Sequence, residues 1–349
     1  MKNRQSRELI TMPAAALVLL AGTSFAGTPE ATTSVVATPD WLTVSGYAAA
    51  SYIFQDGEGV GSSDALFESS TPFDAVKLGL QAVQGPVSAY VSLFYAPVPG
   101  NSAFGAGGDA GILDAYVTYK TGNFSITGGE YVSWLGFESF DAVNMYQMSY
   151  ANAGLGAIPG YHSGVKVEYI TDVIGTGVNL SDSITPRVGG FWEGDGDFTN
   201  GLGYEAYFTY KGIDKLTLWT GAAFEEADGQ DDFVTYDAWA SYDLSDKMTV
   251  AAEIAYSDSG NVQGFQGLVF MKYAFTEKFF TVFRVGFDDY DSVEDTELGV
   301  ETFARQNFRY TIAPSYAFNE HFTLRAEASY VDIDRTDNVF LGVQALLAF

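Results

Sequence analysis

The chain has 349 residues, of which 44 are acidic and 17 basic, giving a formal net charge of −27, and it contains two histidines and no cysteine. The lack of cysteine excludes a disulfide framework, a thiolate metal site and a cysteine nucleophile. The negative charge argues against a nucleic-acid partner, and 27 Phe, 22 Tyr and 5 Trp argue against a disordered chain.

Residues 1–26 have the pattern of a cleaved signal peptide. A basic head containing Lys2, Arg4 and Arg7 precedes an apolar stretch at residues 12–21, and small residues surround a cleavage site after Ala26. The apolar stretch is too short for a transmembrane helix, although it could also be read as the first helix of a mature protein. We expect export from the cytoplasm and a flexible N-terminal leader at residues 27–40.

From residue 41 to residue 349 the hydrophobic pattern has period two. Residues 322–330 are typical, because Phe322, Leu324 and Tyr330 share one face while Arg325 and Glu327 share the other. We predict sixteen strands. They begin near Leu42, Ala75, Val87, Ile112, Phe124, Ser163, Ile184, Tyr204, Leu216, Phe233, Met248, Phe265, Phe279, Arg305, Phe322 and Asn338.

Tight turns and longer connections alternate along this region. Tight turns are expected at residues 84–85, 121–122, 212–215, 244–247, 276–278 and 319–321, with longer connections at residues 55–73, 96–111, 133–161 and 288–301. A soluble β-sandwich shares the alternation of faces, but its strands are shorter and its loops need not alternate. Long strands, an even count and uncharged outer faces in the last five strands predict an all-β, antiparallel, up-and-down transmembrane β-barrel.

The chain ends inside an apolar strand. Val339, Leu341, Val343 and Leu347 alternate up to the terminal Phe349, although chain termini usually fray. This ending resembles the signal by which the barrel-assembly machinery recognises bacterial outer-membrane proteins, and outer-membrane lipid would then surround the barrel.

Residues 136–165 contain a Gly-Phe-Glu-Ser element at 136–139, an Asn-Met-Tyr element at 144–146, Ser149-Tyr150, and a Pro-Gly-Tyr-His-Ser-Gly-Val exit at 159–165. In this order they resemble the OmpL-like family of bacterial outer-membrane β-barrel porins. The resemblance implies a porin rather than an enzyme, with no cofactor. The chain departs from the expected pattern at residues 171–183, where thirteen residues occupy the place of a tight turn.

The connection at residues 133–161 is the longest, and it is rich in aromatic and small residues with two acids. Because such a loop would be unstable in water, we expect it to fold into the lumen and narrow it. Alternatives are a loop that caps the outside or contacts a neighbouring subunit. A barrel of about sixteen strands is wide enough for a water-filled channel.

Charged side chains at a constriction determine selectivity. The constriction is predicted at Glu138, Asp141, Arg284, Arg305, Arg309, Arg325 and Glu327. The arginines would form a basic wall facing acids across the pore; alternatively, these charges pair with neighbours, as Arg325 with Glu327. Further inward-facing candidates are Lys77, Asp114, Lys120, Lys166, Glu168, Arg187, Glu205, Asp237, Glu253 and Lys272.

The long connections are strongly acidic. The predicted acidic vestibule consists of Glu225, Glu226, Asp231, Asp232, Asp288, Asp289, Asp291, Glu294 and Asp295. Such a vestibule concentrates cations, which predicts mild cation selectivity. Arginines at the constriction could reverse this preference. We see no EF-hand pattern and expect no resident metal, with bridging to lipopolysaccharide through divalent ions as a hypothesis.

Several other functions fit the same pattern. A substrate-specific channel could stack sugars on Tyr207, Trp219 and Trp239, and a plugged barrel could act as a structural protein or adhesin. A hydrolase built on His162 has weak support, because His321 lies at the opposite end of the strands. A homotrimer is an analogy with general porins, and the expected solutes are small polar molecules and ions.

Overall fold

The structure, a computed structural model, describes residues 39–57, 63–66, 74–95, 110–151, 158–184, 201–227, 232–258, 262–292, 304–333 and 336–349. The first strands are β1 (Leu42–Gly57), β2 (Ser63–Leu66), β3 (Ala75–Gln84), β4 (Val87–Tyr95), β5 (Ala110–Thr121), β6 (Phe124–Val132), β7 (Tyr161–Ile170) and β8 (Ile174–Ser181). They continue with β9 (Gly201–Ile213), β10 (Leu216–Ala227), β11 (Phe233–Ser245), β12 (Met248–Asp258), β13 (Val262–Ala274), β14 (Phe279–Ser292), β15 (Ala304–Ala317), β16 (Phe322–Ile333) and β17 (Thr336–Ala348).

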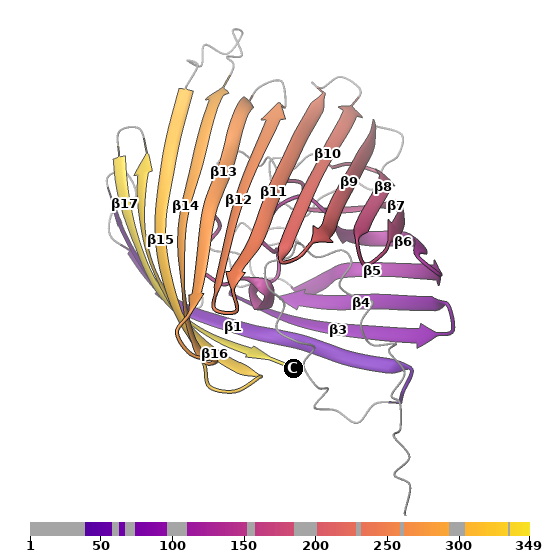
Figure 1. Cartoon of the computed structure of the whole chain (residues 1–349), viewed down its shortest axis with the longest axis horizontal. Helices are drawn as coiled ribbons and strands as arrows, with labels where there is room; N and C mark the ends of the chain where they lie inside the picture. The colour runs from indigo at the N-terminus through magenta and orange to yellow at the C-terminus, as the bar shows by residue number, and fades with distance from the viewer. Residues whose placement is uncertain are drawn as a thin grey trace, which may run out of the picture.

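Sixteen of these strands form a closed antiparallel barrel (Figure 1). Each long strand pairs with its neighbours in sequence, and β1 closes the ring by pairing with β17 from Tyr47 opposite Ala348 to Gly57 opposite Asn338. The terminal Phe349 extends this seam, since its amide donates to the Gly46 carbonyl and its carbonyl accepts from the Gly46 amide. The predicted up-and-down barrel is confirmed.

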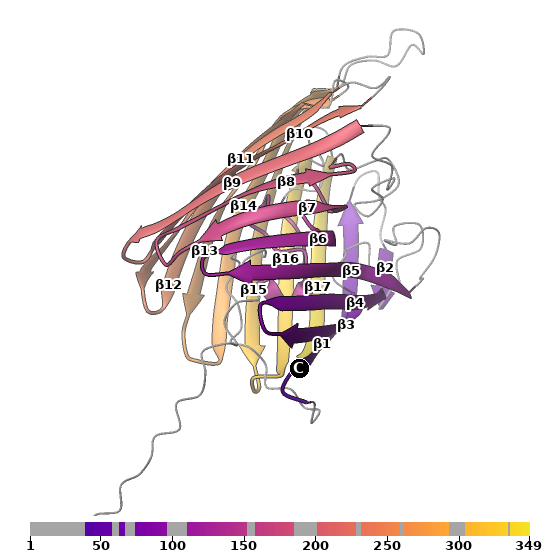
Figure 2. The same ribbon diagram turned by 90° about the vertical axis from the view of Figure 1, so that its right-hand side faces the viewer.

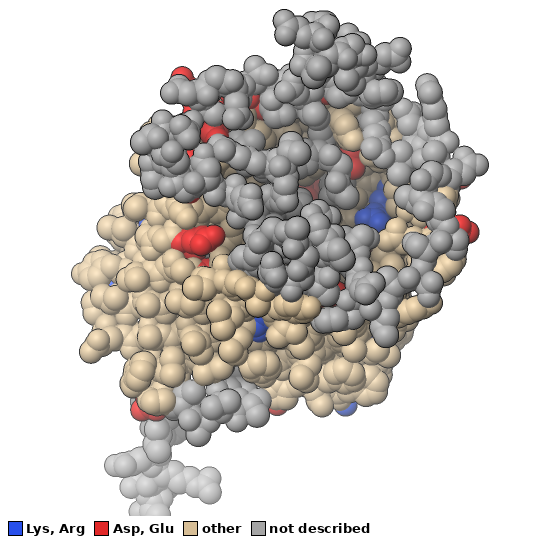
Figure 3. Space-filling model, turned by 180° about the vertical axis from the view of Figure 1, so that it is seen from behind, with Lys and Arg blue, Asp and Glu red and all other residues tan. Residues whose placement is uncertain are grey.

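The two faces of the strands have the polarity that a membrane requires. On β16, Arg325 and Glu327 are buried in the interior while Leu324 and Tyr330 are exposed on the outside. The same alternation recurs around the ring, so many large apolar side chains are exposed on the exterior. Few charged side chains are visible among the described residues of the face in Figure 3. Hydrocarbon around the barrel stabilises this arrangement, which would be unfavourable in water.

The tight turns gather at one end of the barrel. Gly85 and Gly122 supply the positive φ angles, 60° and 58°, that the turns after β3 and β5 require, and Lys215 adopts a φ of 63° after β9. The turn after β7 lies at the same end, at residues 171–173. We call this the short-turn end and the opposite one the long-loop end (Figure 2).

The seventh predicted strand was wrong in position. It begins at Ile174, not near Ile184, because the Thr171 hydroxyl accepts the Ile174 amide at 2.9 Å and closes a three-residue turn. Gly175 and Gly177 interrupt the alternation of apolar and polar residues along β8, so the sequence pattern did not indicate this strand. A Cβ at Gly177 would lie 2.7 Å from the Tyr207 ring and 3.0 Å from the Trp134 ring, so a packing demand keeps this position free of a side chain. The short β2, which pairs with β1, was not predicted.

Candidate functional site

The connection between β6 and β7 lies inside the barrel. We call residues 133–160 the lumen loop; its described parts are residues 133–151, with a short 3₁₀ helix η1 (Ala142–Asn144), and residues 158–160. Its buried side chains include Leu135, Phe137 and Met148. An apolar, aromatic segment is therefore removed from water by the barrel interior.

Carboxylates of the barrel wall hold the first part of the loop. Glu205 accepts a 2.5 Å hydrogen bond from the Ser133 hydroxyl, Asp237 accepts the Gly136 amide at 2.8 Å, and Glu253 accepts the Phe137 amide at 2.5 Å. Bonds from backbone amides to carboxylates are roughly twice as strong as bonds between neutral groups. The loop is fixed along β9, β11 and β12.

The middle of the loop reaches strands β1 and β3. Asp141 forms an ion pair with Lys77 at 3.0 Å and accepts a 3.2 Å hydrogen bond from the Tyr47 hydroxyl. Lys77 also pairs with Asp114 of β5 at 2.9 Å. Since β9–β12 and β1–β3 are well separated in the ring, the loop crosses the lumen.

Arginines of the wall hold carbonyl oxygens in the last part of the loop. Arg325 donates to the carbonyls of Met145 at 2.6 Å and Gln147 at 3.0 Å. Arg284 donates to the Ser149 carbonyl at 2.6 Å and pairs with Glu138, and Arg309 donates to the Tyr150 carbonyl at 2.8 Å. Guanidinium groups thus satisfy backbone acceptors that no regular secondary structure satisfies.

Glu327 and Glu138 complete this network on the acidic side. Glu327 accepts the Met148 amide at 2.5 Å and the Ser149 hydroxyl, while Glu138 accepts the Ala151 amide at 2.6 Å. Carboxylates bind the amides of the loop and guanidinium groups bind its carbonyls. Negatively and positively charged side chains therefore both hold the loop backbone in place.

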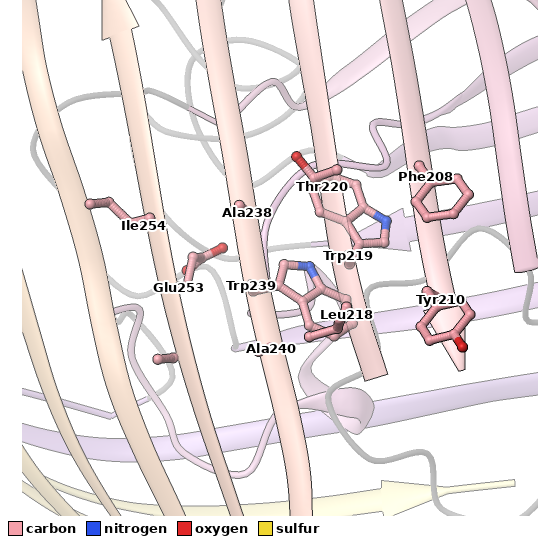
Figure 4. A pocket seen from close by; sticks show the side chains of 11 residues that line it. Phe208, Tyr210, Leu218, Trp219, Thr220, Ala238, Trp239, Ala240, Glu253 and Ile254 are labelled. Atoms are coloured by element: carbon pink, nitrogen blue, oxygen red, sulfur yellow. The ribbon is translucent and has the colours of Figure 1, made fainter. Parts of the chain in front are cut away.

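Aromatic side chains pack the loop against β9–β13. Tyr207, Trp219 and Trp239 stand on three adjacent strands with nearly parallel rings, at centroid distances of 6.3 Å and 5.9 Å; Figure 4 shows the two tryptophans. Trp134 contacts Tyr207 at 4.7 Å and Phe137 contacts Trp239 at 5.6 Å. The three rings are buried, so they pack the loop instead of offering free faces to a sugar.

Tyr146 lies nearer the short-turn end. The Lys272 ammonium lies 4.4 Å from the centre of its ring, a cation–π contact. Burial, followed by the charge of Asp243, raises the pKa of Tyr146 to about 12. Tyr146 thus presents a neutral ring to the Lys272 ammonium.

The structure brings most of the predicted constriction residues to the lumen loop. Glu138, Asp141, Arg284, Arg309, Arg325 and Glu327 all contact it or belong to it. Arg305 is in β15, and its side chain lies outside the described residues. Arg309, Arg325 and Glu327 each bind the backbone of the loop, and Arg284 binds both its backbone and Glu138.

The predicted vestibule divides into two groups. Glu226, Asp232, Asp289 and Asp291 are exposed at the long-loop end. Glu225 and Asp288 depart from the expectation of solvated loop residues, because both lie on strands and are buried; Glu225 accepts the Ile184 amide at 2.7 Å. Asp231, Glu294 and Asp295 lie outside the described residues.

The predicted constriction set omitted several wall residues that hold the loop. Lys77, Glu205, Asp237 and Glu253 had the signal of an inward charge in an alternating strand, but alternation alone does not show which inward charges meet the loop. Tyr47 had no such signal, because a tyrosine fits either face.

His162 is fully buried beside the exit of the lumen loop. Its Nε2 lies 2.9 Å from the Asn179 amide nitrogen and 3.5 Å from Glu205, so its surroundings are those of a structural residue. Among the described residues, no three His, Asp or Glu side chains are grouped as a metal ion would need, and no described helix is long and apolar enough to cross a membrane.

Comparison with known proteins agrees with this architecture. The model of the family described as "Putative beta-barrel porin-2, OmpL-like" matches residues 45–345, whereas no curated protein matches the chain.

Three similar solved structures are outer-membrane proteins. The outer membrane channel DcaP of Acinetobacter baumannii has a TM-score of 0.64 at 12% identity, over 88% of this chain and 97% of that chain. OmpF of Salmonella typhi has a TM-score of 0.61 at 13% identity, over 88% and 97%. OmpT of Vibrio cholerae, in its trimer form, has a TM-score of 0.56 at 15% identity, over 89% and 100%. At these identities the likeness shows the fold.

Proposed function

This chain belongs to the OmpL-like β-barrel porin family, and we propose that it lets small hydrophilic solutes and ions diffuse passively across the outer membrane. One observation carries the proposal: a closed sixteen-strand barrel with a charged interior holds a loop across its lumen through a network of wall carboxylates and guanidinium groups. Such a loop restricts a channel to small solutes.

The passage is narrow in this proposal. The lumen loop contacts strands on both sides of the barrel, and Trp219, Trp239 and Phe270 are buried beneath it. On the wall of β4 and β5, Tyr90 and Tyr116 remain half-buried, with ring centroids 5.4 Å apart, and the Lys120 side chain is exposed. We assign the route of solutes to this wall, where these side chains stay accessible.

Mild cation selectivity follows from the exposed acids at the long-loop end. Glu226, Asp232, Asp289 and Asp291 are exposed there, and a mouth lined by one sign of charge raises the local concentration of counter-ions. Arg284 and Arg325, which could oppose this preference, bind the loop backbone. The acids also provide ligands for divalent ions that bridge to lipopolysaccharide.

Export and assembly complete the proposal. Residues 1–26 act as a signal peptide that is cleaved, and the chain passes through the inner membrane to the outer membrane. Phe349 at the seam between β1 and β17 is the residue that the assembly machinery recognises. The assembled protein is a homotrimer, as one similar structure is described in a trimer form.

A plugged structural barrel is the second candidate, favoured by the same contacts of the loop on both sides of the lumen. Single-channel recording in planar bilayers separates the two. A porin gives ohmic steps in the wild type, and shortening the loop between residues 138 and 150 enlarges them. A plugged barrel is silent until the loop is shortened, and that result would overturn passive diffusion.

A further inference from the structure

Among the described residues, one buried ammonium group of the lumen lies over aromatic rings and has no anionic partner. Lys166 of β7 faces the interior and is 8% exposed. Its Nζ lies 4.3 Å from the ring centre of Tyr131 and 5.1 Å from that of Trp134. Within the part of the chain that the structure describes, it makes these two ring contacts and no hydrogen bond or ion pair. Aromatic faces stabilise a cation without occupying its N–H donors, so these donors are available to a ligand.

Other buried basic groups of the described lumen have acceptors. Lys77 pairs with Asp141, and the guanidinium groups of Arg284 and Arg325 bind carbonyl oxygens of the lumen loop. Burying an unpaired charge is costly, so a lysine that only anchored the loop would be expected to have an acceptor of this kind. The donors of Lys166 are not used by the described chain, which indicates a binding residue instead of an anchor.

Strand register places Lys120 and Glu168 on the same wall, close to the short turns. Lys120 of β5 lies opposite Ser125 of β6, which lies opposite Glu168 of β7, so the two charged residues are two strand spacings apart, about 10 Å. Lys120 is exposed, whereas Glu168 is buried and accepts a 3.0 Å hydrogen bond from the Tyr207 hydroxyl. Lys120 supplies a second cation for an anion bound at Lys166. Because Glu168 lies two residues along the strand from Lys166, it would repel a further negative charge, and the site favours an anion with a single charge.

Small residues separate the two lysines. The inward positions of β6, between β5 and β7, are Ser125, Thr127 and Gly129, and Thr127 lies opposite Lys166. At these three positions β6 has no large side chain between Lys120 and Lys166. A small solute can therefore lie over the backbone of β6 and contact both cations.

Tyr90 and Tyr116 add hydroxyl groups on the β4 and β5 side of this wall. Their side chains are half-buried, with ring centroids 5.4 Å apart, and neither phenol forms a hydrogen bond with the residues that the structure describes. The Tyr116 ring lies 6.5 Å from that of Tyr131, over which the Lys166 ammonium sits. A phenol both donates and accepts hydrogen bonds, so these tyrosines suit the hydroxyl groups of a solute whose anionic end is bound by Lys166.

We propose that Lys166, Lys120 and Tyr116 form a binding site for a small monocarboxylate that carries hydroxyl groups. The Lys166 ammonium donates to the carboxylate, and Lys120 and Tyr116 bind the hydroxylated part. The inference rests on the proposed passive diffusion along the wall of β4 and β5, and it names the class of solute. A site with one fixed ammonium also releases its ligand readily, as passage through a channel requires.

The acids at the long-loop end do not conflict with an anion site. Their repulsion is screened over about 8 Å at physiological ionic strength, whereas Lys120 lies at the opposite end of the strands, two residues before the short turn at Gly122. The acids therefore act on small ions at the mouth, and the lysines act on one class of organic anion deeper in the lumen.

Gluconate is the probe for this site. In planar bilayers in KCl, gluconate should interrupt the current through the wild-type channel in a concentration-dependent way. Lys166→Met keeps the length of the side chain and its contact with the two rings, and it should raise the half-blocking concentration about tenfold, the effect of losing one charge-assisted hydrogen bond. The matched control is Lys272→Met, because Lys272 is another lumen lysine held over aromatic rings, those of Tyr146 and Phe280; it should leave the half-blocking concentration unchanged.

Three further solutes test the chemistry of the ligand. Glucose lacks the charge, acetate lacks the hydroxyl groups and inorganic phosphate carries a second charge as its dianion, so each should block less than gluconate. Tyr116→Phe keeps the ring and should reduce the advantage of gluconate over acetate. Block by glucose or phosphate at or below the gluconate concentration would overturn the assignment to a monocarboxylate, and equal block by acetate would overturn the role of the hydroxyl groups.

Failure of the site and failure of the proposed function give different results. Ohmic KCl steps that gluconate does not interrupt, or interrupts equally in Lys166→Met, would overturn the site and leave the porin intact. Silent bilayers would overturn passive diffusion, and calorimetry of gluconate with folded, detergent-solubilised protein then decides the site: binding that is weakened in Lys166→Met supports it, and binding that is absent or unchanged overturns it. If Lys166→Met does not fold, Lys120→Met at an exposed position replaces it and should also weaken binding.

Discussion

Arg284 of β14 and Glu138 of the lumen loop form an ion pair inside the barrel, 146 residues apart in the sequence. The Arg284 side chain is fully buried and also binds the Ser149 carbonyl and the Thr311 hydroxyl. One guanidinium group therefore joins both ends of the loop's central segment to the wall.

Arg284→Met should loosen the loop. Removing one partner of a buried ion pair typically costs about 3–5 kcal/mol, because the other charge is left uncompensated. We expect a larger and noisier single-channel conductance and earlier unfolding in heat. Arg284→Met combined with Glu138→Gln should recover part of the stability, since no unpaired charge remains; equal destabilisation by the single and double variants would contradict a direct pairing.

Asp237→Asn and Glu253→Gln test the acidic anchors of residues 136–137. Each amide variant keeps the shape but weakens a charge-assisted bond to a backbone amide, at a cost of about 1–3 kcal/mol. We expect faster proteolysis of the lumen loop in folded, detergent-solubilised protein. Asp243→Asn, on the same strand as Asp237 but exposed near the short turns, is the control and should leave cleavage unchanged.

Gly177→Ala should destabilise the barrel, although alanine usually favours a strand more than glycine does. The added Cβ would meet the Tyr207 ring at 2.7 Å and the Trp134 ring at 3.0 Å, and overpacking typically costs about 1–3 kcal/mol. The measurement is the midpoint of urea unfolding followed by tryptophan fluorescence. Val178→Ala, one residue further and outward, is the control; a midpoint for Gly177→Ala at or above that of the wild type would show that the aromatic packing yields easily.

Neutralising the exposed acids should reduce cation preference. The variant carries Glu226→Gln, Asp232→Asn, Asp289→Asn and Asp291→Asn, and the readout is the reversal potential in a KCl gradient. We expect a shift toward the anion side that is largest at low salt, because screening at 1 M shortens the Debye length to about 3 Å. The buried Glu225 is left unchanged, since it holds the Ile184 amide. A reversal potential that does not move would assign selectivity to the lumen.

The sequence by itself determined the barrel. Alternation along strands such as β15 and β16, the series of tight turns and the apolar terminal strand all follow from local rules, because a strand between lipid and a polar lumen must present opposite faces at successive residues. Alternation did not reveal the short β2 or the position of β8. In β8, Thr209 occupies the space of a side chain at Gly175, and Tyr207 and Trp134, distant in sequence, occupy that at Gly177.

Only the tertiary structure decided what the inward charges do. Period-two alternation shows that Arg284, Arg325 and Glu327 point inward, but it does not show whether water, another strand or a loop meets them. Their partners include backbone atoms of Met145, Met148 and Ser149, and backbone groups have no residue-specific signal in the sequence. Closure of the ring brings these distant segments within hydrogen-bond distance. Arg284 and Arg325, which were predicted to form a basic wall, therefore hold the lumen loop in place.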